Sequence, residues 1–107
     1  MSGADRIRKV FALVQQKHPG IADLFAADAV IVYGRNARAE GRESIREFYR
    51  RAIEDMSPQP EVRLVLEAPP LYVAVIDVRT TSDSYRALDL FEVDEVGIRR
   101  LEIYSQA

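Results

Sequence analysis

The sequence predicts an α+β fold, in which helices in the first half of the chain cover a sheet formed mainly by the second half. Helical patterns span residues 2–17 and about 42–55, where apolar residues recur every three or four positions. From residue 62 onwards the chain is predicted to form strands, in which apolar and polar residues alternate, separated by short turns. Strands joined by tight turns pair antiparallel, so we expect an antiparallel sheet.

Length and composition limit the function. A chain of 107 residues is expected to form one domain, residues 1–107. A net charge of −2 argues against a nucleic-acid-binding protein, and no apolar run is long enough to span a membrane. The N-terminus turns polar at once and shows no secretory signal, so we expect a cytoplasmic protein. With no cysteine and a single histidine, His18, we expect no metal site and no cofactor.

The first helix is predicted to begin at Ser2, because Ser2 and Asp5 have the spacing of a capping box. One apolar stripe along it contains Ile7, Val10, Phe11 and Val14. Pro19 cannot continue this helix but suits the first turn of another, so a short second helix is expected to carry Ile21, Leu24 and Phe25.

A strand is predicted over Ala29–Tyr33, followed by a polar turn over residues 34–38. The third helix is predicted over Arg42–Asp55, and it has the clearest apolar stripe of the chain: Ile45, Phe48, Tyr49, Ala52, Ile53 and Met56. The remaining strands are predicted over Val62–Ala68, Leu71–Thr80, Ser84–Val93 and Ile98–Ser105. Strict alternation would place Val62, Leu64 and Leu66 on one face of the sheet and Val65 on the other.

Asp89 is the most informative residue of the chain. Alternation puts it on the same strand face as Tyr85, Ala87, Phe91 and Val93, so a single carboxyl group lies in an apolar row. An unpaired charge buried there would be costly, and the group must pair, accept hydrogen bonds or take up a proton. Three interpretations remain open: a functional acid on a pocket wall, a structural carboxylate bonded to Tyr49 or a backbone amide, or a strand register shifted by one residue, which would put Asp89 on the outer face.

Three segments of the chain resemble the ketosteroid isomerase-like branch of the nuclear transport factor 2 superfamily, which includes the SnoaL-like cyclases. Residues 24–33 are similar to the family's helix-to-strand segment, residues 40–50 to its Gly-Arg-Glu helix entrance, and residues 88–104 to its terminal hairpin. The resemblance implies a cone-shaped, curved antiparallel sheet with a mixed edge, wrapped around three N-terminal helices. It also implies a conical pocket between the sheet and the helices, and dimers formed through the convex face of the sheet.

The resemblance also implies roles for individual residues. Asp89 falls at the position of a protonated acid that donates a hydrogen bond to the substrate, and Tyr49 at a supporting tyrosine. The position of the carboxylate base falls on Tyr33. Phe11 falls near the position of a second hydrogen-bonding tyrosine, and Phe25 at another supporting tyrosine. Because Tyr33 is not a carboxylate, we do not expect efficient isomerisation of a Δ5-3-ketosteroid.

Strand parity and the helix stripes predict which residues face the pocket. We expect Asp89 as the catalytic or donor group and a ligand-binding wall of Phe11, Phe25, Ile31, Tyr33, Tyr49, Ile76, Phe91, Leu101 and Ile103. Limonene epoxide hydrolase has the same fold, and Asp77 and Arg79 resemble part of its catalytic set. However, parity places both on the convex face, which favours the isomerase-like interpretation.

Two function classes therefore stay open. The first is a protein that binds a small hydrophobic molecule in the pocket, with isomerase- or cyclase-type chemistry at Asp89. The second is a non-catalytic dimeric binding or assembly module. The convex face is predicted to mix apolar and charged side chains and so to form a homodimer; we assign to it Val65, Val73, Val75, Leu88 and Leu90 among Arg63, Asp77, Arg86, Glu92, Arg100 and Glu102.

Overall fold

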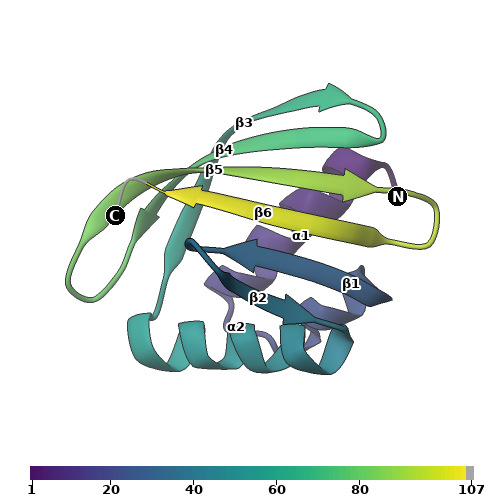
Figure 1. The fold of residues 1–107 in the computed structure, drawn as a ribbon. Coiled ribbons are helices and arrows are strands. Elements are labelled where there is room, and N and C mark those ends of the chain that lie inside the picture. Colours follow the sequence, from purple (N-terminus) through teal and green to yellow (C-terminus); the bar gives the residue numbers. More distant parts are fainter. Residues whose placement is uncertain (106–107) are drawn as a thin grey trace.

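The computed structural model describes residues 1–105 and has the α+β architecture predicted from the sequence (Figure 1). Two α-helices and one 3₁₀-helix lie against a curved, unclosed sheet. In chain order the elements are α1 (Gly3–Gln15), η1 (Pro19–Leu24), β1 (Phe25–Tyr33), β2 (Ala37–Glu40), α2 (Arg42–Met56), β3 (Gln59–Ala68), β4 (Leu71–Arg79), β5 (Ser84–Val93) and β6 (Ile98–Ser105).

The sheet has the strand order β2-β1-β6-β5-β4-β3. All neighbouring strands are antiparallel except β1 and β6, which are parallel. A mixed sheet was expected, and the parallel pair joins the strand nearest the N-terminus to the last strand of the chain. In Figure 1, α1 lies behind the sheet and α2 runs below it, so the helices and the sheet enclose the interior.

The N-terminal half confirms the predicted helices and corrects two boundaries. The Ser2 side chain caps α1 by accepting a hydrogen bond from the backbone N–H of Asp5 at 3.0 Å. Pro19 begins η1 as predicted, but η1 ends at Leu24, and Phe25 already belongs to β1. The segment predicted to be a turn over residues 34–38 contains the start of β2, whose pairing with β1 supplies hydrogen bonds that its polar sequence does not indicate.

The start of α2 is attached to β1 by hydrogen bonds to backbone carbonyls of the strand. The N–H of Gly41 donates to the carbonyl of Ala29 at 2.8 Å. The Arg42 guanidinium donates from Nη2 and Nε to the carbonyl of Phe25, at 2.7 and 3.2 Å. The pairing of β1 with β6 shifts register between Phe25 and Val30, so these contacts stabilise an irregular stretch of the strand.

A β-bulge in β3 changes which of its residues face the helices. The register shifts between Val62, which pairs with Ile76, and Leu64, which pairs with Val75. One extra residue at Arg63 reverses the alternation, because side-chain direction has a period of two. The predicted faces are therefore wrong beyond this point. Leu64 and Leu66 lie on the convex face, whereas Val65 packs against the core.

The core lies between the concave face of the sheet and the helices. Its fully buried side chains include Ile7 and Val10 of α1, Ile45 of α2 and Phe91 of β5. Phe11 of α1 meets Phe91 edge-on, with ring centroids 6.1 Å apart. No helix within residues 1–105 is long and apolar enough to cross a membrane.

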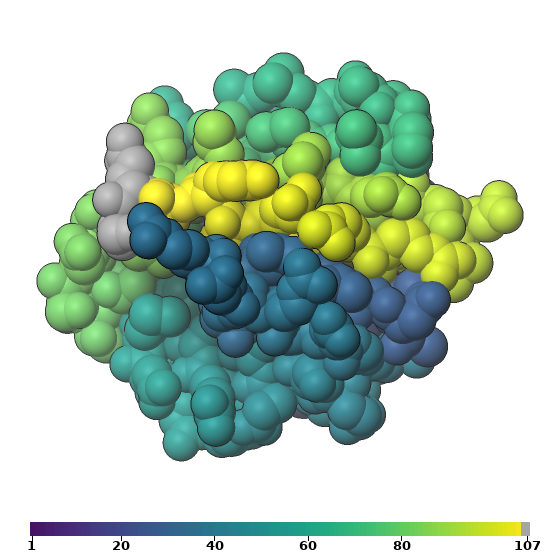
Figure 2. All heavy atoms as spheres, in the orientation of Figure 1, coloured from purple at the N-terminus to yellow at the C-terminus, as the bar shows by residue number. Residues whose placement is uncertain are grey.

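The convex face carries an exposed apolar row that crosses four strands. Leu64, Val75, Leu88 and Tyr104 are successive cross-strand partners, and Leu66, Val73 and Leu90 form the next row. Asp77 lies beside the row and binds both Arg63 and Arg86 at 2.9 Å. Figure 2 shows the molecule from the side of the sheet that faces away from α1, with β2 and β1 above α2, β6 above them, and β5, β4 and β3 towards the top. An exposed apolar row bordered by charges of both signs is typical of a self-associating surface.

We therefore expect the protein to form a homodimer through this row. Leu88, which is 46% exposed, is the test position, because an arginine there would bring a charge into the centre of the interface. Light scattering at micromolar concentration should give a dimer for the wild type and a monomer for Leu88→Arg. Val96→Arg is the matched control, since Val96 is 59% exposed but lies in the β5–β6 turn. A wild-type monomer would contradict the prediction.

Candidate functional site

Asp89 lies on the concave face near the middle of β5, as predicted. Ala87 and Phe91 flank it along the strand, and its cross-strand partners are Ala74 of β4 and Ile103 of β6. Only 4% of Asp89 is exposed, and among the described residues it is the one charged side chain that is buried. Strand pairing therefore surrounds the carboxyl group with four apolar neighbours within the sheet.

The Asp89 carboxyl group lacks the partners that buried polar groups normally have. Its Oδ1 atom is buried without a hydrogen bond to any described residue. Burial raises the pKa of Asp89 from its usual value near 4 to about 7, because an apolar environment disfavours the ionised form. The group is therefore substantially protonated near neutral pH, and in that state it can donate a hydrogen bond.

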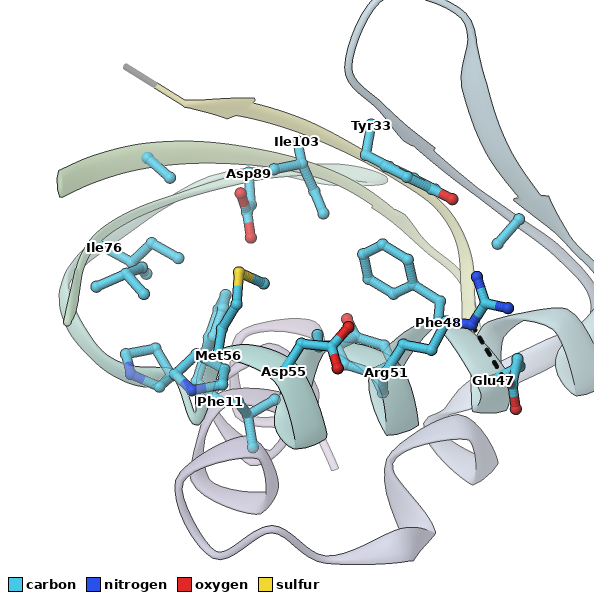
Figure 3. Close-up of a pocket in the computed structure, with 18 of the residues that line it drawn as sticks. Phe11, Tyr33, Glu47, Phe48, Arg51, Asp55, Met56, Ile76, Asp89 and Ile103 are labelled. Carbon is cyan, nitrogen blue, oxygen red and sulfur yellow. Dashed lines mark hydrogen bonds and ion pairs between the residues drawn. The ribbon is translucent and has the colours of Figure 1, made fainter. Parts of the chain in front are cut away.

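A pocket of about 880 Å³ opens in front of Asp89, between the concave face of the sheet and the two α-helices. Figure 3 shows the carboxyl group pointing from the sheet into the pocket, with the Met56 side chain facing it from α2. Six of the residues predicted at the site line the pocket: Phe11, Tyr33, Tyr49, Ile76, Asp89 and Ile103.

Four residues predicted to line the pocket do not do so. Phe25, Ile31, Phe91 and Leu101 are completely or almost completely buried in the core. Ile31 and Leu101 are partners in the parallel pair of β1 and β6, where the inner face is filled by packed side chains. The Phe25 ring packs 6.0 Å from that of Tyr49, and the Phe11 ring packs against Phe91. Alternation gave the correct sheet face for Ile31, Phe91 and Leu101, whereas Phe25 was predicted on a helix and lies at the start of β1. The packing of side chains in the core decided where the pocket ends.

The two tyrosines implied by the resemblance occupy different parts of the pocket. Tyr49 is half-buried. Burial is the main reason that the pKa of its hydroxyl is raised, and the negative charge of Asp89 raises it further, so the hydroxyl stays protonated. Tyr33 lies at the pocket wall beside Phe48, with ring centroids 4.6 Å apart. No hydrogen bond joins either hydroxyl to Asp89 within residues 1–105, so a structural carboxylate held by Tyr49 is not what the structure shows.

Several pocket residues were not predicted from the sequence. Phe48 and Met56 were assigned only to the apolar stripe of α2, yet both line the pocket together with Asp55. Tyr85 also lines it, and its position two strand repeats before Asp89 could have indicated this. The pKa of Tyr85 is raised mainly by burial and to a smaller extent by the negative charge of Asp89.

Charged groups of α2 lie around the pocket mouth. Glu47 accepts hydrogen bonds from Arg50 at 2.6 and 2.9 Å and from Arg51 at 3.3 Å. These two cations lower the pKa of Glu47 to about 2, and Arg50 has the larger effect. Asp55 is exposed at the same edge. Nowhere in the described chain do three or more potential metal ligands gather.

The epoxide hydrolase interpretation has no assembled site. Asp77 and Arg79 lie on the convex strand positions, facing away from Asp89. Both Asp77 oxygens are engaged by Arg63 and Arg86, whose hydrogen bonds lower its pKa.

A family model for the SnoaL-like domain matches residues 7–88. The chain belongs to the SnoaL-like domain family. This agrees with the resemblance of its three sequence segments to the nuclear transport factor 2 superfamily. No protein with a curated description matches this SnoaL-like sequence.

Solved structures agree in fold with this SnoaL-like chain. A nuclear transport factor 2-like protein of unknown function from Cytophaga hutchinsonii is 12% identical, with a TM-score of 0.85 over 99% of this chain and 91% of that one. A proposed polyketide cyclase from Sinorhizobium meliloti is 20% identical, with a TM-score of 0.84 over 92% and 93% of the two chains. A proposed SnoaL-like polyketide cyclase from Jannaschia is 11% identical, with a TM-score of 0.83 over 97% and 85%. At these identities the likeness shows the fold alone.

The raised pKa of Asp89 predicts how stability depends on pH. Because the folded pKa is about 7 and the unfolded value is about 3.9, the folded state holds a proton that the unfolded state loses between these values. The free energy of unfolding should therefore fall as pH rises from about 4 to about 7, by up to about 4 kcal/mol. Urea denaturation should show Asp89→Asn close to wild type at pH 4.5 and more stable by about 2–4 kcal/mol at pH 8.

Asp55→Asn is the matched control for this experiment, because Asp55 lines the same pocket but is exposed. Its stability should follow that of the wild type across the pH range. A carbon NMR titration of the Asp89 carboxyl with a midpoint at or below 4 would contradict the prediction.

Proposed function

We propose that this SnoaL-like protein binds an apolar small molecule in the pocket, and that protonated Asp89 donates a hydrogen bond to an acceptor atom of that molecule. The observations that support the proposal are that Asp89 lines a cavity of about 880 Å³ and that the Oδ1 atom of its carboxyl group is buried without a partner in the described chain. Apolar pockets with few polar groups are the usual form of small-molecule sites. A ligand carbonyl or hydroxyl would satisfy the carboxyl group that the chain leaves unpaired.

The chemistry that fits this arrangement is of the cyclase or isomerase type. A neutral carboxylic acid in an apolar site can stabilise negative charge that develops on a carbonyl oxygen. Tyr33 and Tyr49 would orient the ligand, since both line the pocket and both present rings and hydroxyls. The sheet holds Asp89 between β4 and β6, so its position is fixed before the ligand enters.

A non-catalytic dimeric binding module is the second candidate. It is favoured by Tyr33, which stands where the isomerase base is expected, and by the exposed row of Leu64, Val75, Leu88 and Tyr104 on the convex face. Such a module would keep the pocket and bind ligands without converting them. The two candidates differ in turnover and agree in ligand binding.

A thermal-shift screen of steroids, polyketide-like ketones and aromatic acids tests the binding proposal. Ligands with a carbonyl acceptor should raise the melting temperature of the wild type at pH 6, where Asp89 is largely protonated. Asp89→Ala should lose this shift, and Asp55→Ala should keep it. A screen in which no acceptor ligand distinguishes wild type from Asp89→Ala would overturn the proposal.

Isomerisation of a Δ5-3-ketosteroid should be slow or absent. Loss of a general base typically costs about 10²–10⁴-fold in rate, and Tyr33 offers no carboxylate to act as that base. Phe11 also has no hydroxyl to offer as a second donor. A spectrophotometric assay for the conjugated product should give no more than weak turnover, and Tyr33→Asp should increase it. Strong wild-type turnover would refute this prediction.

A further inference from the structure

The pocket has features that a neutral hydrogen-bond donor does not use. Five aromatic side chains line it: Phe11, Tyr33, Phe48, Tyr49 and Tyr85. Four carboxyl groups line it as well, with Asp89 buried inside and Glu43, Glu47 and Asp55 on α2. Aromatic faces and carboxylates both attract cations.

Among residues 1–105, α1, β4 and β6 place no charged side chain on the pocket wall around Asp89. Of the lining residues, β4 contributes Ile76 and Val78, β6 contributes Ile103, and α1 contributes Phe11 and Val14, none of which is charged. The titratable groups that share the pocket interior are the hydroxyls of Tyr33, Tyr49 and Tyr85.

Two arginines line the pocket, and both are exposed and engaged by acids. Arg51 donates to Glu47 at 3.3 Å, and Arg38 donates to Glu40 at 3.4 Å. Neither bonds to Asp89, whose Oδ1 has no partner in the described chain. Glu43 and Glu47 are paired with Arg46 and Arg50, whereas Asp55 and Asp89 have no ion pair within residues 1–105, so ionisation of Asp89 adds a negative charge that no described ion pair offsets.

We propose that the pocket also binds protonated primary and secondary amines that carry an apolar or aromatic body, with the ammonium group donating to the Asp89 carboxylate among the aromatic rings. This goes beyond the proposed function, although it uses the same pocket, because the ligand meets the ionised form of Asp89 rather than the protonated one.

The geometry favours amines that retain an N–H bond. An N–H donor would give the pocket-lining Asp89 carboxylate a hydrogen-bond partner that the described chain does not supply, and a charge-assisted hydrogen bond is stronger than a neutral one. The neighbouring rings add a cation–π attraction. A quaternary ammonium group would keep the second contribution but could not make the hydrogen bond, so it should bind more weakly than the matching primary amine.

Protonation of Asp89 separates the two ligand classes. A carbonyl ligand needs the protonated acid, so its affinity should fall as pH rises through about 7, the pKa of Asp89 in the empty pocket. An amine needs the carboxylate, so its affinity should rise over the same interval. Alkylamines with a pKa near that of lysine, about 10.4, stay protonated throughout.

Isothermal titration with 4-phenylbutylamine and with the ketone 4-phenylbutan-2-one at pH 5.5 and 8.5 tests this inference. The affinity for the amine should increase by about 30-fold between the two pH values, and the affinity for the ketone should decrease. Asp89→Asn should remove the pH dependence and weaken amine binding at pH 8.5. Asp55→Asn should keep the pH dependence, because it leaves the buried carboxyl group in place. The trimethylammonium analogue of the amine should bind more weakly than the amine itself.

The outcomes separate this inference from the proposed function. If the ketone binds with the expected pH dependence but the amine does not bind, or binds equally at both pH values, amine recognition is wrong and the proposed function stands. If the amine binds as expected and the ketone does not, the donor role of Asp89 is wrong instead. Binding of neither ligand would overturn this inference and count against the pocket as a ligand site. The wild-type titrations alone decide among these results, so the conclusion does not depend on the folding of Asp89→Asn.

Discussion

The pairing of β4, β5 and β6 is the constraint on which the rest of the structure depends. Its register sets Asp89 between Ala74 and Ile103 and keeps the carboxyl group on the concave face, away from water. A slip of one residue would turn the whole row to the convex face. The same register aligns Val75, Leu88 and Tyr104 on the outside. One set of backbone hydrogen bonds therefore creates both the acidic pocket and the apolar outer surface.

The buried carboxyl group has an energetic cost that the fold retains. Its ionised form is disfavoured by burial, and its protonated form still leaves Oδ1 without a partner in the described chain. An asparagine or an apolar residue would avoid the cost of ionisation. Groups of this kind are concentrated at functional sites, because a partner supplied by a ligand gains the hydrogen bond that the protein does not make.

The pocket differs from a generic apolar cavity in how its polar groups are distributed. Asp89 lies inside it, while ion pairs such as Arg51 with Glu47 lie at exposed positions of α2. Exposed pairs of this kind contribute little to stability. They do place charges of both signs where a ligand would enter, whereas the interior offers aromatic rings and one acid. A pKa of about 7 lets that acid present either of two chemical forms at neutral pH.

The sequence by itself determined the fold class, both long helices, the four C-terminal strands and the concave placement of Asp89, because these follow from local periodicity and strand alternation. Tertiary structure decided the rest. The bulge at Arg63 turned Leu64 outward, since an extra residue in one strand leaves no periodic signal in the sequence. The strand β2 formed because β1 lies beside it, not because its own residues favour a strand. Phe91 and Leu101 were excluded from the pocket by the side chains packed over them, and only the three-dimensional arrangement shows where packed core ends and open cavity begins.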